Sequence, residues 1–419
     1  MNKKGYKHTS LGWIPEDWEV KRLEEISEIQ QGVSKGRSIS PEDAISVPYM
    51  RVANVKDGVI DLAEVKEIVI NKNELSRYTL LDGDILITEG GDPDQLGRGG
   101  IWTNSIKNCV FQNHLFRIRT DRSKLDQFFL YNYFQGFSAK AYFLSCAKQT
   151  TGIASINSSQ VRATPISLPS VLEQRRITAI TATWDAAIYK VQRLVDTLQI
   201  RHRGLMHVLL SGKKRLKGFE GKWSNVTYGD LLSEVKRPVL WNDDDLYRLI
   251  SVRRRSGGIF ERESLYGHQI KVKDLRTACA GDFLFSKMQI VHGASALVPE
   301  DFDRAKISGS YIAVVSKNSR KLDINFFDWH SRRPYFYHQT YISSFGVHIE
   351  KMTFDFEAFL SLDMALPPLE EQIAIVNILN ASDREIQLHR RRLATLQEQK
   401  KGLMQVLLTG KVRVKPKEE

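Results

Sequence analysis

The sequence is poor in cysteine. Its three cysteines, Cys109, Cys146 and Cys279, lie far apart in 419 residues, and none belongs to a Cys-x-x-Cys pair. Neither a zinc site nor a disulfide framework is indicated by this spacing. The pattern fits a reducing compartment, and we expect a cytoplasmic protein.

Long apolar runs are also missing. The first ten residues are polar and lack the apolar core of a signal peptide. Elsewhere, no window of about 18 residues is free of charge, as a membrane-spanning helix would require. We therefore expect neither export nor membrane insertion.

The motifs of several enzyme classes do not occur. No GxxxxGK[ST] run is present to cradle a nucleotide phosphate, and the ten histidines form no HExxH pair. The string nearest to an amino-methyltransferase tetrapeptide, Asp92-Pro93-Asp94, has no aromatic residue. We predict no catalytic residue, no metal ligand and no cofactor bound by this chain.

One segment has the spelling of a nuclease site. Pro41-Glu42-Asp43 is followed by Glu64-Val65-Lys66, so two carboxylates could hold Mg²⁺ and a lysine could orient water. The same Glu-Val-Lys tripeptide begins at Glu19 and Glu234 in different settings. We therefore interpret the spelling as chance.

Positive charge is in excess. Sixty-one Lys and Arg residues against 49 Asp and Glu leave a formal net charge of +12. Such an excess indicates a phosphate backbone or an acidic protein surface as partner, without choosing between them.

An internal repeat organises the chain. Residues 168–217 match residues 366–415 without a gap, at an offset of 198, and about 22 of the 50 positions are identical. Each copy begins Leu-Pro, continues with Glu-Gln, and ends Leu-Leu-[Ser/Thr]-Gly-Lys. The chain therefore consists of two related halves.

Both copies have the pattern of one long helix of about 40 residues. Pro169 and Pro367 suit a first turn, and Gly212 and Gly410 suit a C-terminal stop. Apolar residues follow steps of three and four in both copies, interrupted at Thr181, His202, Ser382, His389 and Lys400, which is typical of a helix–helix seam. The predicted seam residues are Ile177, Trp184, Ile188, Val191, Val195, Leu198, Leu205, Leu209, Ile375, Leu379, Ile386, Leu393, Leu396, Leu403 and Leu407.

A helix this long reaches roughly 60 Å and needs a partner along its length. The two helices can lie against each other as a rod, or each can simply cover its own domain. The remaining sequence mixes short strand-like and helix-like runs, which predicts α+β domains. We divide the chain into a first globular part (1–167), a central helix (168–213), a second globular part (214–365), and a C-terminal helix with a basic tail (366–419).

Loops that combine cations with amides and hydroxyls are candidates for contacts with DNA bases and phosphates. In the first half the candidates are Lys35, Arg37, Arg51, Asn54, Lys56, Arg98, Gln112, Asn113, His114, Lys148 and Thr151. In the second half they are Arg253, Arg254, Arg255, Lys287, Gln289, His292, Ser310 and Tyr311. Arg253 to Arg255 stand out because the glycine turn that follows can bring them close to a duplex.

In its order of segments the chain resembles the specificity subunits of type I restriction-modification systems. The opening Gly12-Trp13-Ile14-Pro15-Glu16-Asp17-Trp18, the segments at Tyr49 to Asn54 and Gly83 to Leu86, and above all the two Leu-Pro…Glu-Gln helices carry this resemblance. It spans essentially the whole chain. In the second half, Tyr247 to Gly258 matches the Tyr49 to Gly58 pattern poorly.

The resemblance implies two α+β target-recognition domains separated by two long antiparallel helices with a pseudo-two-fold repeat. It also implies that each domain reads half of a bipartite site on double-stranded DNA while the helices set the spacer. Two modification subunits would dock on the helices and restriction subunits would join them, and those partners would hold S-adenosylmethionine, ATP and Mg²⁺. The alternatives are a DNA-binding scaffold and a single-chain nuclease or methyltransferase whose motifs have drifted.

Overall fold

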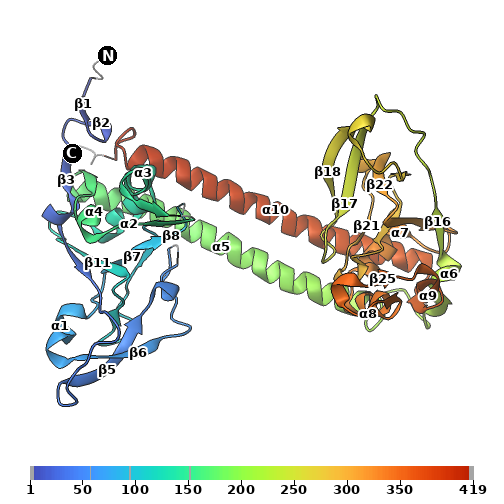
Figure 1. Ribbon diagram of the computed structural model, residues 1–419, viewed down its shortest axis with the longest axis horizontal. Helices are drawn as coiled ribbons and strands as arrows, with labels where there is room; N and C mark the ends of the chain where they lie inside the picture. Colours follow the sequence, from blue (N-terminus) through green and yellow to red (C-terminus); the bar gives the residue numbers. More distant parts are fainter. Residues whose placement is uncertain (1–3, 57, 94–95, 151, 415–419) are drawn as a thin grey trace. The chain divides into compact units, whose positions relative to one another are not determined.

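The computed structural model describes residues 4–56, 58–93, 96–150 and 152–414. The chain separates into two compact units (Figure 1). Unit 1 comprises residues 1–191 and 392–419, and unit 2 comprises residues 192–391. Each unit therefore contains one globular part together with half of each long helix, whereas the sequence suggested that the helices are segments of their own. In the described residues, no helix combines the length and apolar character needed to cross a membrane.

The long helices are α5 (Val171–Leu209) and α10 (Leu369–Leu407), with 39 residues each. Both begin shortly after the repeated Leu-Pro, and both are followed by a glycine in the left-handed conformation, Gly212 (φ 69°) and Gly410 (φ 67°). Glycine takes this conformation without the clash that a Cβ would cause, so it ends the helices well. The length and the ends predicted from the repeat are confirmed.

The two helices lie side by side and antiparallel (Figure 1). In unit 1, Lys400 near the end of α10 pairs with Asp185 near the start of α5 at 2.6 Å. In unit 2, Arg201 pairs with Glu385, and His202 Nδ1 lies 3.0 Å from Ser382 Oγ. In unit 1 the C-terminal part of α10 thus contacts the N-terminal part of α5. In unit 2 the N-terminal part of α10 contacts the C-terminal part of α5.

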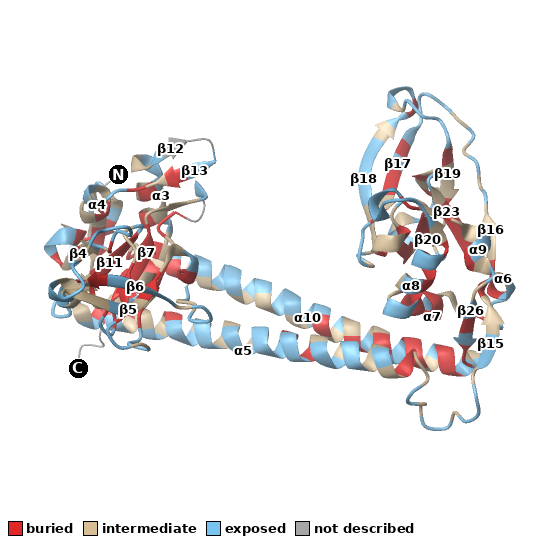
Figure 2. Cartoon of the chain, turned by 60° about the horizontal axis from the view of Figure 1, so that its bottom comes forward, coloured by how far each residue is buried: buried red, intermediate tan, exposed pale blue. Residues whose placement is uncertain are grey.

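The predicted seam residues are all buried or half-buried (Figure 2). At its two ends the seam also joins the cores of the globular parts. Ile177 and Leu407 belong to the core of unit 1, and Leu209 and Ile375 belong to the core of unit 2. The helices therefore pair with each other and, at their ends, also pack into the cores of their units.

Unit 1 is built around an antiparallel sheet of four strands in the order β4-β11-β7-β9. Their bounds are β4 (Ser27–Gln31), β11 (Leu115–Thr120), β7 (Ile85–Thr88) and β9 (Gly99–Ile101). The second sheet contains β10 (Val110–Phe111), β5 (Ala44–Met50) and β6 (Lys66–Asn71), and the third contains β12 (Lys148–Thr150), β13 (Ile153–Ser155) and β8 (Gly90–Gly91). Two further strand pairs are β1 (Tyr6–Thr9) with β2 (Gly12–Pro15), and β3 (Glu19–Arg22) with β14 (Pro165–Leu168). The short helices are α1 (Leu75–Tyr78), α2 (Gln127–Gln135), α3 (Phe137–Cys146) and α4 (Ser158–Arg162).

Unit 2 repeats this plan. Its four-stranded sheet has the order β16-β23-β20-β21, and its second sheet has the order β18-β17-β22-β19. The bounds are β16 (Leu232–Val235), β23 (Tyr311–Ser316), β20 (Phe283–Ser286), β21 (Ser295–Leu297), β18 (Ile259–Tyr266), β17 (Leu246–Val252), β22 (Ala305–Ser308) and β19 (Leu275–Ala278). The remaining elements are β15 (Ser224–Thr227), β24 (Ser344–Phe345), β25 (Thr353–Phe354), β26 (Asp363–Leu366), α6 (Tyr228–Leu231), α7 (Ile324–Ser331), α8 (Pro334–Ile342) and α9 (Phe356–Leu360).

The central strands β7 and β20 are buried on both faces, which explains their continuous apolar sequences. Ile85 and Ile87 of β7 point into the core shared with the helices of unit 1, while Leu86 points into the core beside the second sheet. A buried aspartate precedes each strand. Asp84 accepts two hydrogen bonds from the Arg119 guanidinium, and Asp282 accepts two from the guanidinium of Arg237. The repeated Gly-Asp is therefore a structural feature of both sheets.

The repeated Glu-Gln at the start of each long helix is also structural. The carboxylate of Glu173 accepts hydrogen bonds from Trp18 (3.1 Å) and from the guanidinium of Arg413 (2.8 Å), which follows α10. Glu371 does the same with Trp223 (3.1 Å) and with Arg215, which follows α5 (2.7 Å). The segment after each long helix is thus bound by hydrogen bonds to the first turn of the other long helix.

Candidate nucleic-acid interface

In unit 1, several of the candidates gather where neighbouring strands end. Arg51 follows β5, and Gln112 to His114 connect β10 to β11. Hydrogen bonds join these segments: Gln112 N–H donates to Met50 C=O (2.9 Å), and Val52 N–H donates to Gln112 Oε1 (3.2 Å). The ends of β5 and β10 therefore present Arg51 and residues 112–114 side by side.

The end of β7 and the β12–β13 hairpin complete this surface. Glu89 N–H donates to His114 C=O (3.0 Å), Ile156 N–H donates to Glu89 C=O (2.8 Å), and Thr88 N–H donates to Arg98 C=O (3.0 Å). Lys148 begins the hairpin and is exposed. We call face 1 the surface formed by residues 51–52, 89–90, 98, 112–114, 148 and 152–155. It contains a hollow of ≈ 440 Å³ lined by Val52, Glu89, Gly90, His114 and Ser155.

Other first-half candidates lie apart from face 1 or are held by other groups. The guanidinium of Arg37 makes two hydrogen bonds to Glu74, at 2.8 and 2.9 Å. Glu74 follows β6, whose last residue pairs with the first residue of β5, so Arg37 lies at the end of the sheet away from Arg51. Lys35 lies over the ring of Tyr49, with Nζ 5.6 Å from its centroid.

Two more candidates, Asn54 and Lys56, belong to the loop after β5. Asn54 is buried, and its amide donates to Asp61 C=O (2.9 Å) and Glu64 C=O (3.0 Å) and accepts from Arg51 N–H. The position of Asn54 therefore does not support the predicted DNA contact and fits a role in shaping the loop. Lys56 is exposed and pairs with Asp61 at 2.5 Å. Thr151 lies outside the described residues.

In unit 2, all three predicted groups converge. Arg255 N–H donates to His292 C=O (2.7 Å), and Lys287 N–H donates to Ser310 C=O (2.9 Å). The β24–β25 hairpin joins them, because Phe354 N–H donates to Lys287 C=O (2.9 Å). We call face 2 the surface formed by residues 253–256, 287–292, 308–311 and 344–354. The same kinds of segment form face 1.

Several cations of face 2 have side-chain partners nearby. Arg253 lies over the ring of Phe260, with its Cζ 4.4 Å from the centroid. Glu350, which lies between β24 and β25, pairs with Arg254 at 2.8 Å, and its second oxygen lies 3.2 Å from His292 Nε2. A hollow of ≈ 310 Å³ opens here and is lined by Arg254, Arg255, Val291, His292 and Tyr337.

The remaining candidates of face 2 differ in accessibility. The Oε1 atom of Gln289 is buried and has no hydrogen-bond partner among the described residues, which is an unfavourable state for an amide oxygen. The hydroxyls of Ser310 and Ser308 lie 2.6 Å apart. Tyr311 is half-buried, and its hydroxyl accepts from Val252 N–H at 3.4 Å.

Sequence reasoning missed two acidic residues, Glu89 and Glu350, and the β24–β25 hairpin, whereas it did name Lys148 of the β12–β13 hairpin. In the second half, β17 ends at Val252, four residues beyond the position that the repeat offset gives for the end of β5. One signal was available, because an arginine directly follows both strands: Arg51 and Arg253. The poor match of Tyr247 to Gly258 therefore reflects a shift in the chain and not the loss of the strand.

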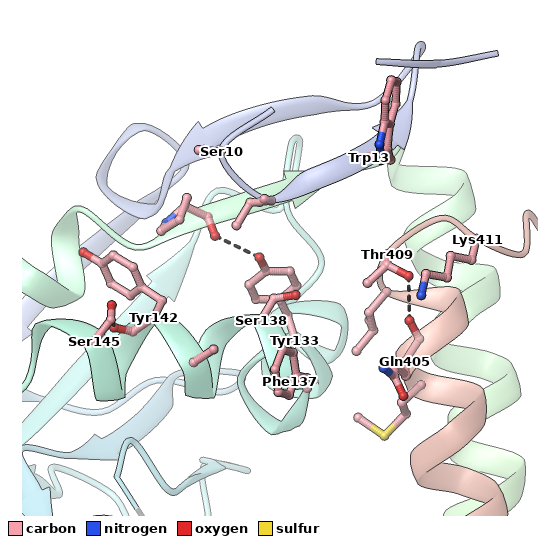
Figure 3. Close-up of a pocket in the computed structure, with 16 residues that line it drawn as sticks. Ser10, Trp13, Tyr133, Phe137, Ser138, Tyr142, Ser145, Gln405, Thr409 and Lys411 are labelled. Atoms are coloured by element: carbon pink, nitrogen blue, oxygen red, sulfur yellow. Dashed lines mark hydrogen bonds between the residues drawn. The ribbon is translucent and has the colours of Figure 1, made fainter. Parts of the chain in front are cut away.

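A separate and larger pocket of ≈ 730 Å³ lies in unit 1 between β2, α3 and the end of α10 (Figure 3). Trp13, Phe137 and Met404 are part of its mostly apolar lining, and Lys411 is the charged residue of that lining among the described residues. None of the predicted DNA-contact residues lines it. We therefore do not include this pocket in the nucleic-acid interface.

Comparison with known proteins agrees with this arrangement. The family model of the type I restriction modification DNA specificity domain matches residues 15–195 and 235–398. The putative type I restriction enzyme MjaX specificity subunit of Methanocaldococcus jannaschii is 27% identical over 438 residues, covering 99% of this chain and 98% of the relative. The EcoKI specificity subunit of Escherichia coli K12 is 25% identical over 199 residues, which cover 47% of this chain and 41% of that subunit.

Solved structures show the same fold. A chain from a study of complex assembly and conformational transition of the type I R-M system has a TM-score of 0.62 at 17% identity, covering 95% of this chain and 99% of that one. The HsdS subunit from Thermoanaerobacter tengcongensis has a TM-score of 0.52 at 17% identity, covering 95% and 98%. Together with the family match over most of the sequence, these findings show that the chain belongs to the type I restriction-modification DNA specificity family.

Proposed function

We propose that this chain is the DNA-specificity subunit of a type I restriction-modification complex, in which each unit reads one half of a bipartite, asymmetric site. The observation that carries this proposal is the repetition of one sheet plan with two different faces. Face 1 and face 2 are built from equivalent segments, yet one presents Arg51, Gln112 and His114 and the other presents Arg253 to Arg255. Two units with the same sheets but different contact residues are suited to recognising two different DNA sequences.

Each face has the chemistry that a DNA duplex requires. Arginines bind phosphates or guanine edges, and amides and hydroxyls pair with base edges in the major groove. The face of each unit also carries a hairpin, β12–β13 or β24–β25, beside the cationic loops. We infer that these loops and hairpins enter the major groove together.

The long helices would set the distance between the half-sites. Each helix continues from one unit into the other, and its glycine, Gly204 or Gly402, lies in the last two turns. At about 1.5 Å per residue, such a helix is long enough for two readers to engage grooves about one turn of DNA apart. The helices would also provide the docking surface for two modification subunits and, through them, for restriction subunits.

The chain itself would perform no catalysis. S-adenosylmethionine, ATP and Mg²⁺ would be held by the partner subunits, and the methylated adenine would leave the DNA stack to enter the modification subunit. We also propose a cytoplasmic location, where the DNA and these partners are found together.

Methylation by purified components tests the proposal. The chain combined with its cognate modification subunit should methylate adenine within a split, asymmetric site, whereas the chain alone should transfer no methyl group from S-adenosylmethionine. Transfer by the isolated chain would contradict the non-catalytic role. A complex that methylates a continuous site would contradict the two-reader function.

A further inference from the structure

One backbone position is held in the same way in both units but carries opposite charges. Glu89 directly follows β7, and Lys287 directly follows the equivalent strand β20. In unit 1 the N–H of Glu89 donates to residue 114 (3.0 Å), and its C=O accepts from residue 156 (2.8 Å). In unit 2 the N–H of Lys287 donates to residue 310 (2.9 Å), and its C=O accepts from residue 354 (2.9 Å). The two positions are therefore structurally equivalent.

Both side chains are anchored by a neighbour on their own half of the molecule. The side chain of Glu89 is 28% exposed, Glu89 lines the hollow of face 1, and one carboxylate oxygen lies 2.6 Å from Nδ1 of His114. The ammonium of Lys287 donates to Gly309 C=O at 3.0 Å, and its side chain is half-buried. A lysine ammonium has three N–H donors, so this bond leaves donors for a ligand. Such anchoring lowers the entropy that each side chain loses when it contacts a base.

The charge at this position decides what it can recognise. A carboxylate repels phosphate, so on a DNA-binding face its favourable partners are amino groups, and acidic side chains accept from N4 of cytosine in the major groove. A lysine donates to O6 and N7 of guanine. The same backbone position therefore suits a base with an amino donor in one half-site and a base with acceptor atoms in the other.

We propose that residues 89 and 287 are specificity-determining: Glu89 reads a cytosine amino group in one half-site, and Lys287 reads a guanine in the other. This inference rests on the proposed function, in which each unit reads one half-site. His114 is a positioning residue that orients the carboxylate of Glu89. The opposite charges are one reason why the two half-sites differ in sequence.

Methylated sites mapped genome-wide for the complete complex test this inference. Glu89→Gln, which keeps the shape of the side chain, should reduce discrimination at one base position of one half-site by about tenfold, within the range of a single base contact. Lys287→Met should do so at one position of the other half-site. In both variants the opposite half-site and the spacer should stay as in the wild type.

Matched controls lie outside the faces. Glu42→Gln and Lys236→Met remove the same charges at exposed positions, and both should keep the wild-type site. Thermal melting of each variant shows whether it is folded. Folded Glu89 and Lys287 variants with the wild-type site preference, or with a loss spread evenly over all positions, would overturn the inference. A wild-type complex without a split site would instead overturn the proposed function, and this inference with it.

Discussion

At the scale of single residues, the arginines after β17 are the best-defined candidates for phosphate contacts. Arg253, Arg254 and Arg255 are exposed, and the backbone of Arg255 is tied to the loop that carries His292. Replacing all three by alanine should weaken DNA binding and flatten its salt dependence, because each lost phosphate contact removes about 0.9 from the slope of log K against log salt. Titrations at several salt concentrations measure this slope.

Arg262→Ala is a suitable control for the triple variant. Arg262 is also exposed in unit 2, but it lies on β18 and pairs with Glu263. It should leave the slope unchanged. If the triple variant also keeps the wild-type slope, these arginines are not part of the interface.

Glu173 provides a prediction for stability. Burial raises the pKa of this carboxyl, but hydrogen bonds from Arg413 and Trp18 lower it, and the net pKa lies below the ordinary value. Glu173→Gln should therefore destabilise unit 1 at neutral pH by about 1 to 2 kcal/mol, because the amide lacks the charge that holds Arg413, while Arg413 keeps its pair with Asp17. Denaturant unfolding of the variant and the wild type gives this difference.

The pH dependence of that effect follows from the direction of the shift. A carboxyl whose pKa is lowered by folding stabilises the protein above its unfolded pKa of about 4.3, and this stabilisation is lost as the pH falls through the folded pKa. The difference between wild type and Glu173→Gln should therefore shrink at pH 3. The exposed Glu16 offers a control, since Glu16→Gln should change stability little at either pH. An equal effect of the two substitutions would contradict the role of the Glu173 pairs.

At the scale of elements, the sequence predicted best what local pattern determines. The repeat predicted both long helices, since their apolar spacing and end signals lie within each copy. The strand-like sequences at Asp84 to Thr88 and at Tyr311 to Val315 form β7 and β23. The residues that determine each of these elements lie within one short segment of the sequence, so the sequence alone indicates them.

The faces could be predicted only in part, because residues far apart in the chain build them. Arg51 and residues 112–114 were recognised as polar loops, but their meeting depends on the parallel pairing of β5 with β10. Glu89 was missed because a carboxylate repels phosphate, so an acidic residue was not considered as a DNA contact. Only the structure shows that Glu89 occupies the same backbone position as Lys287. Asn54 resembled a base-reading amide, yet its partners are backbone carbonyls of its own loop. Polar residue type alone does not distinguish these cases.

At the scale of the whole molecule, the proposed role of the helices as a ruler makes a prediction. Four residues inserted after Val191 in α5 and four after Arg391 in α10 extend both helices where they pass between the units, so contacts within each unit keep their register. Each helix should lengthen by about 6 Å and change phase by only about 40°. With about 3.4 Å per base pair, the preferred spacer should grow by one or two base pairs while both half-sites keep their sequence.

Genome-wide mapping of methylated sites measures the spacer of this variant. A variant with the same insertions in α5 alone serves as the comparison, because it disturbs the pairing of the helices and should lose activity without a new spacer. A folded, active double-insertion complex with an unchanged spacer would rule out the ruler.

The end of each long helix packs with the start of the other, and this also affects the order in which the protein can fold during synthesis. Unit 2 is one continuous stretch, residues 192–391, whereas the core of unit 1 needs Met404, Leu407 and Leu408 from the end of the chain. Domains of nascent chains usually complete in order from the N-terminus. Here we expect the reverse order, because all residues of unit 2 are synthesised before those of unit 1 are complete. The apolar core of unit 1 should stay incomplete until the last part of α10 has left the ribosome. Premature termination near residue 391 should therefore release a chain with a complete second unit and an incomplete first one.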